Sequence, residues 1–218
     1  MVLAYPLSRN QFMATLPIAK MSFTLPERMQ SNVTKGGERI SADIGPRLWV
    51  GQVTLDVLEP AEAGPVQAML DLLRASDASF LAYDVSRPGP YRDMHGVILG
   101  ASTPSIQTLP AGNQTMSLTG LPPGYVLSAG DRLSFTYTNG STRYALHRIL
   151  ETVMADATGT TPAFQVLPAI RPGAVTGTAV TLIRPFCKVE LIAGSVTDPE
   201  VHHTVTRGGA LKFQQTLR

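Results

Sequence analysis

The sequence predicts a mainly β protein with one helix, and two observations lead to this fold class. The 218 residues include 19 Gly and 17 Pro, so turns should be frequent and helices few. Short segments of alternating apolar and polar residues recur along the chain, whereas the spacing of an amphipathic helix occurs convincingly once. We expect an N-terminal sheet with one helix, closed by the C-terminal strand, and a small all-β module inserted into it.

The first strands should lie in an N-terminal arm and in a long alternating segment. Up to about Gly45, short apolar pieces broken by prolines indicate one or two strands, and the polar stretch 31–39 indicates a loop or hairpin tip. Arg47–Leu58 then alternates, and this predicts a strand. One face of that strand should carry the side chains Trp49, Val53, Leu55 and Val57.

The single helix is expected over Glu62–Arg74, within about residues 61–75. Glu62 near its start and Arg74 near its end suit the helix dipole. A short strand, Ala78–Asp84, should follow. The apolar side chains that define one face of the helix are Val66, Met69, Leu70 and Leu73.

After the Pro/Gly-rich break Arg87–Asp93, short strands with Thr, Ser and Gly between them predict an all-β module. Its clearest feature is a hairpin in which Asn139 and Gly140 form a type I′ turn between Arg132–Thr138 and the returning strand 143–150. Further strands are expected at Met116–Leu121, Ala163–Leu167, Ala179–Ile183 and Lys188–Ile192.

The last strand, Ala210–Leu217, follows two glycines and places Leu211 and Phe213 on one face. We expect it to return to the first sheet near Trp49. Residues 1–87 plus 187–218 would then form one domain, and residues 88–186 the inserted module, because Pro-rich joints bracket that segment.

Composition excludes several classes of protein. The net charge is +2, charged residues make up 16% of the chain, and no long run of like charges occurs, so we expect no nucleic-acid binding of its own. The lone Cys187 cannot form an internal disulfide and is interpreted as a small buried residue. The sequence shows neither a membrane span nor a signal peptide, which predicts folding in the cytoplasm.

The basic residues are unusual, because 14 of the 18 are Arg. Arg is enriched in protein interfaces and Lys is depleted, which would suit a surface covered by other subunits. The codon usage of a GC-rich genome would give the same bias, and both explanations stay open.

Candidate catalytic residues lie in the β module: Asp131, His147 and Asp156, with Ser134 or Ser128 as a serine partner. Each has a structural explanation. Asp131 and Asp156 occupy turns, where Asp bonds its own backbone, and His147 should be half-buried in a strand. We expect no catalytic residue and no enzyme.

The remaining candidates are two histidines and two aromatic residues. His202 and His203 are adjacent, so on a strand they point to opposite faces and cannot share a metal by themselves. Trp49 and Tyr83 could form a sugar-stacking platform, but both lie in expected strands, where packing is their usual use. No metal ligand, cofactor-binding residue or cofactor is assigned.

Several segments, taken in order, resemble distal tail proteins of long-tailed phages and of phage-like gene transfer agents. In the first half they are AYPLSRNQF, GPRLWVGQVTL and SFLAYD. The second half resembles a β module that recurs in phage tail and tail-hub proteins. Its segments are GLPPGYVLSAGDRLSFTY, LHRILETVMADATG, FQVLPAIRP, GTAVTLIRP and CKVELI.

The resemblance implies a structural virion protein at the tail tip, assembled in the host cytoplasm. Residues 1–87 with 187–218 would build a ring, usually of six copies, and the β module would project from it. Its partners would be further copies of itself, the tail tube protein and hub or baseplate proteins, with tail fibres as a further candidate and no membrane. The alternative function is a glycan-binding or hydrolytic β module that uses Asp131, His147 and the aromatic residues.

Overall fold

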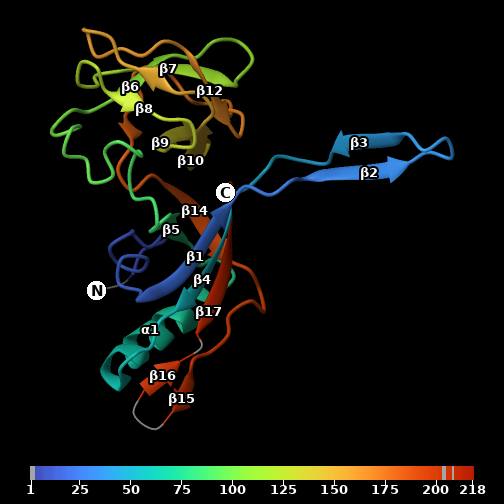
Figure 1. Ribbon diagram of the computed structural model, residues 1–218. Helices are drawn as coiled ribbons and strands as arrows, with labels where there is room; N and C mark the ends of the chain where they lie inside the picture. Colours follow the sequence, from blue (N-terminus) through green and yellow to red (C-terminus); the bar gives the residue numbers. More distant parts are fainter. Residues whose placement is uncertain (1–2, 203–204, 208) are drawn as a thin grey trace.

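The computed structural model describes residues 3–202, 205–207 and 209–218, and the fold is mainly β with a single helix in this part of the chain (Figure 1). The predicted fold class is confirmed. The body has a sheet with its helix at one end and a curled sheet at the other, and a long hairpin projects from its side. No helix in the described ranges is long and apolar enough to cross a membrane.

The first sheet has five antiparallel strands, and its central strand comes from the C-terminus. β17 pairs with β4 on one side and with β14 on the other, so the predicted return of the last strand to the Trp49 region is confirmed. In spatial order the strands are β1 (Ile18–Thr24), β4 (Val50–Leu55), β17 (Ala210–Gln215), β14 (Phe186–Leu191) and β5 (Phe80–Tyr83).

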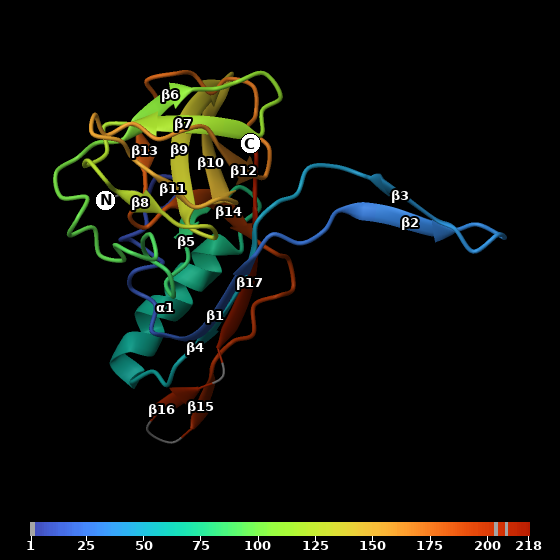
Figure 2. The same ribbon diagram turned by 45° about the horizontal axis from the view of Figure 1, so that its top comes forward.

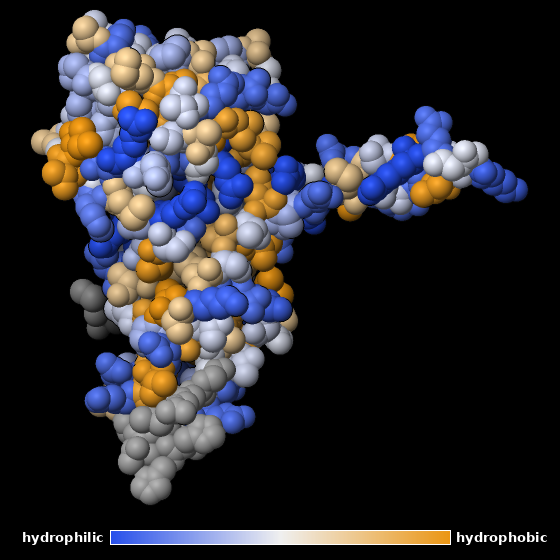
Figure 3. Space-filling view, viewed as in Figure 1, coloured by the Kyte–Doolittle hydropathy of each residue, from blue (hydrophilic) through white to orange (hydrophobic). Residues whose placement is uncertain are grey.

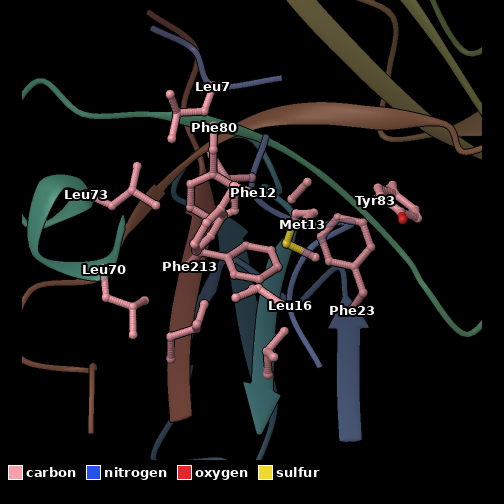
Figure 4. Packing of buried hydrophobic residues seen from close by; sticks show 14 of the residues in the cluster. Leu7, Phe12, Met13, Leu16, Phe23, Leu70, Leu73, Phe80, Tyr83 and Phe213 are labelled. Atoms are coloured by element: carbon pink, nitrogen blue, oxygen red, sulfur yellow. The ribbon is translucent and has the colours of Figure 1, made fainter. Parts of the chain in front are cut away.

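The helix α1 (Pro60–Leu73) covers one face of this sheet and buries the side predicted from the sequence. Figure 4 shows Leu70 and Leu73 of α1 directed toward Phe80 and Phe213 of the sheet. Phe80 and Phe213 pack edge to face with their ring centroids 5.5 Å apart. Leu211 and Phe213 are both fully buried, as their alternation predicts.

The second sheet curls into a nearly closed barrel with its own apolar interior. Its edges meet where Ser105 bridges to Ala179 and the Ile106 N–H donates to the Thr178 carbonyl. In spatial order the strands are β13 (Val180–Thr181), β9 (Arg132–Asn139), β10 (Ser141–Ile149), β12 (Phe164–Leu167), β7 (Thr115–Thr119) and β6 (Ser105–Thr108).

The hairpin of β9 and β10 is confirmed, but its turn is not type I′. That turn needs a positive φ at both Asn139 and Gly140, and only Gly140 has one, at 73°. Asn139 pairs with Ser141 and Thr138 with Thr142, so the strands are shifted by one residue from the register that a two-residue loop would give.

Other strand boundaries also differ from expectation. The predicted strand Arg47–Leu58 is shorter, because pairing ends at Leu55, and Val57 is 44% exposed instead of buried. Five strands have no clear signal in the sequence, because they are short or barely alternate: β6, β8 (Val126–Leu127), β11 (Val153–Met154), β15 (Glu200–His202) and β16 (Val205–Arg207). The segment up to Gly45 holds three strands, not one or two: β1, β2 (Met29–Val33) and β3 (Arg39–Asp43).

The projecting hairpin consists of β2 (Met29–Val33) and β3 (Arg39–Asp43), and we call residues 29–43 the arm (Figure 2). The polar stretch 31–39 does form its tip. Every residue of both strands is exposed, and the strands pair only with each other in the described structure. The arm and its base leave four large apolar side chains in contact with solvent: Met29, Val33, Ile40 and Ile44.

Candidate functional site

Hydrogen bonds and an ion pair between distant segments meet at the junction between the five-stranded sheet and the barrel. Trp49, which directly precedes β4, is fully buried and donates its indole N–H to the Leu146 carbonyl of β10 over 2.8 Å. The Gln215 side chain accepts from the Trp49 backbone N–H and donates to the Tyr144 carbonyl. These bonds join strands of the two sheets.

An ion pair crosses the same junction. The Arg132 guanidinium on β9 binds Asp84, which follows β5, and the two side chains are 9% and 8% exposed. Burial alone would raise the pKa of Asp84, but hydrogen bonds from Ser86 and the charge of Arg132 outweigh burial and hold this pKa below its ordinary value. Asp84 is therefore ionised at neutral pH and compensates the buried guanidinium.

Further arginines surround this pair. The guanidinium carbons of Arg132 and Arg148 lie 5.4 and 5.2 Å from the centroid of the Trp49 ring, which is a cation–π geometry. Arg47 donates to the Leu25 and Pro26 carbonyls at the base of the arm, and Arg87 lines a small pocket together with Arg132. We call Arg47, Arg87, Arg132 and Arg148 the arginine cluster.

The structure does not bring the predicted catalytic residues into one site. Asp131 accepts from the backbone N–H groups of Ser128 and Tyr91, over 2.7 and 2.8 Å, so it holds its own turn and the loop 87–93. Burial raises the pKa of Asp131, and those two N–H donors oppose the rise. Its partners are not those of His147.

The His147 side chain is buried among packed neighbours, not half-buried as expected. Its Nδ1 lies 2.7 Å from the Pro168 carbonyl, which can only accept, so Nδ1 carries the proton and donates. The imidazole stacks on Phe135 with ring centroids 5.3 Å apart. Burial lowers the pKa of His147 to about 4, so the ring is neutral at pH 7.

The other predicted candidates also have local roles. Asp156 accepts from Thr158 and Thr160 in its own turn, as predicted. The Ser134 hydroxyl accepts from the Phe186 N–H across the junction, and Ser128 contributes its backbone N–H to Asp131. None of these contacts pairs a nucleophile with a base.

The aromatic and metal candidates do not form a site either. Trp49 is 0% and Tyr83 is 5% exposed, so neither offers a face to a sugar. His202 lies in β15, and His203 lies outside the described residues. No group of potential metal ligands occurs within residues 3–202, 205–207 and 209–218. Cys187 is fully buried, as expected, and burial raises the pKa of its thiol.

The junction has no recognisable signal in the sequence. Asp84 and Arg132 are 48 residues apart, and no local motif joins them. The excess of Arg over Lys did not place any site in the sequence, although stacking on Trp49 does suit a planar guanidinium.

An apolar groove of about 550 Å³ lies between α1 and the N-terminal segment, away from the junction residues. Its lining includes Phe12, Leu16, Pro65, Val66 and Met69. Such a lining binds apolar groups and offers no paired acid and base for catalysis.

Comparison of the sequence with protein-family models and with curated proteins gives no match.

Proposed function

We propose that this chain is a structural subunit of a phage-like tail, forming a ring at the distal end of the tail tube and connecting the tube to hub and fibre proteins. The order of its sequence motifs supports the tail assignment. The exposed arm supports assembly, and it is the observation that carries the proposal.

The arm is difficult to explain in an isolated monomer. A two-stranded hairpin without a third strand or a covering helix is only marginally stable in water. This arm buries none of its residues, yet it carries Met29, Val33 and Ile40. Figure 3 shows hydrophobic residues on the surface of the projecting hairpin. An arm of this kind gains a partner surface when copies associate, because the apolar side chains then leave water.

The five-stranded sheet offers a second assembly surface. Its edge strand β1 pairs with β4 on one side, and no strand pairs with its other side in the described part of the chain. An open edge of seven residues is a template for pairing with another chain. The arm and this edge would suit repeated contacts between identical subunits, as a ring requires.

The experiment is to purify the full chain and measure its mass by light scattering at tens of micromolar, with negative-stain electron microscopy of the same sample. We expect rings or stacked rings, and six copies is the expected number. Ring binding to tail tube and hub proteins from the same particle would test the position in the tail. A strictly monomeric chain would contradict the proposal.

A variant without the arm makes this test specific. The Ile44 N–H donates to the Arg28 carbonyl over 3.0 Å, so the two ends of the arm are adjacent. Replacing residues 29–43 by Asn-Gly should close this gap with a tight turn. We expect a folded body that no longer assembles, with the near-ultraviolet signal of Trp49 unchanged. Unchanged ring formation by this variant would show that the arm is not needed.

A further inference from the structure

The arginine cluster carries more positive charge than its neighbouring carboxylates balance. Arg132 has Asp84 as its partner, but Arg148 lies over the Trp49 ring with no carboxylate at ion-pair distance among the described residues. Arg87 lines a small pocket with Asp131, and its charge opposes the rise in the pKa of that carboxyl, so Asp84 and Asp131 balance the four guanidinium groups only in part. The cluster can therefore accept further anionic groups.

Part of the cluster is open to solvent. Arg87 is exposed, and Arg47 and Arg148 are half-buried. Burial lowers the pKa of Arg148, the positive charges of Arg132, Arg87 and Arg47 lower it further, and the charge of Asp84 raises it, so these groups lie close together. A planar guanidinium held on an aromatic ring is well suited to a planar carboxylate.

The complementary charge occurs at the other end of the body, around α1. Residues 56–77 contain five carboxylates and one Arg, so this segment has a net charge of −4 (1 − 5), whereas the whole chain has a net charge of +2. Asp71 is already paired with Arg74. Asp56 and Glu59 are exposed and form no ion pair within the described ranges.

We propose that Arg87 and Arg148 bind the carboxylates of Asp56 and Glu59 from a second copy of the chain. This inference rests on the proposed function, namely that identical copies assemble. The contact joins two different surfaces, so it is heterologous, and repeating it gives a closed ring when the rotation between copies allows closure. Complementary charges would also orient the copies as they associate.

Charge exchange tests the contact. Arg87→Glu and Asp56→Lys both change exposed residues, and each should weaken association at low salt by about tenfold or more. The combined variant Arg87→Glu/Asp56→Lys should recover most of the loss, because the opposite charges again face each other. Arg92→Glu is the matched control, since Arg92 is exposed and is not among the charges that act on Arg148.

Binding of a fluorescein-labelled hexaglutamate peptide tests the cluster without assembly. In Asp56→Lys, which weakens the contact between copies and leaves the cluster accessible, we expect peptide binding and at least a tenfold loss when Arg148→Gln is added, measured by fluorescence anisotropy. Equal peptide binding by both chains would overturn the carboxylate site. Rings formed equally well by wild type, Arg87→Glu and Asp56→Lys would overturn the second-copy contact and leave the proposed function intact. A monomeric wild type would overturn the proposed function, and the contact with it.

Discussion

Phe213 on β17 lies directly over the backbone of Gly51 on β4. The two residues are opposed in the antiparallel register, and an added Cβ at position 51 would lie 2.1 Å from the Phe213 ring. Gly51 is therefore needed for space, because the ring fills the position that a side chain would occupy. This contact fixes the register between the C-terminal strand and the strand that begins beside Trp49.

Gly51→Ala should destabilise the protein by about 1 to 3 kcal/mol or more, because the new methyl group overpacks against a fully buried ring. Denaturant unfolding followed by Trp49 fluorescence measures the effect. Gly36→Ala is the control, since its nearest neighbour would lie 3.8 Å away, and it should leave stability nearly unchanged. Phe213→Leu should partly rescue Gly51→Ala, and equal stability of Gly51→Ala and wild type would contradict the packing argument.

Truncation after Arg207 should unfold the five-stranded sheet, because it removes the central strand β17 and the buried side chains Leu211 and Phe213. Burying two such side chains contributes roughly 3 to 6 kcal/mol before entropy costs, and the net stability of a domain is about 5 to 15 kcal/mol. We expect the truncated chain to be insoluble or molten in its first half, with the barrel still giving dispersed NMR signals. A fully native truncated chain would contradict this expectation.

Asp84→Asn should cost about 3 to 5 kcal/mol, because it leaves the Arg132 guanidinium buried without its counter-charge. Arg74→Ala, which removes the exposed pairs with Asp71 and Asp198, should cost about 1 kcal/mol or less. Since the pKa of Asp84 is lowered in the folded state, the pair stabilises the protein above pH 4 and loses this effect as the pH falls further. If urea titrations gave a similar decrease in the free energy of unfolding for Asp84→Asn and Arg74→Ala, a buried compensating pair would be disproved.

His147 should make stability fall between pH 6.5 and about pH 4. The unfolded chain binds a proton near pH 6.5, whereas the buried ring does so only near its pKa of about 4, so acid favours the unfolded state in this window. The difference corresponds to about 3 kcal/mol. In His147→Asn, whose side-chain N–H can still reach the Pro168 carbonyl, the free energy of unfolding should change less with pH over this range. An identical pH profile for both proteins would exclude His147 as the titrating group.

The sequence determined those features that depend on local spacing. The alternation around Trp49 and at Leu211 and Phe213 identified strands of the first sheet, since a period of two places every second side chain on the buried face. The apolar spacing from Val66 to Leu73 identified α1. The turn roles of Asp131 and Asp156 also followed from local chemistry, because their bonds to Ser128 and Thr158 span two or three residues.

Tertiary structure alone decided the contacts between distant segments. The pairing of Arg132 with Asp84 and the stacking of Arg148 on Trp49 join residues that have no periodic relation in the sequence. The shift at Asn139 and the exposure of Val57 depend on where strand pairing ends. The sequence predicts a loop or hairpin tip at residues 31–39. Only the folded structure shows that the arm makes no strand pairing with the body in the described residues. Local patterns report which face of a segment is apolar, whereas only the packed fold decides which partner covers that face.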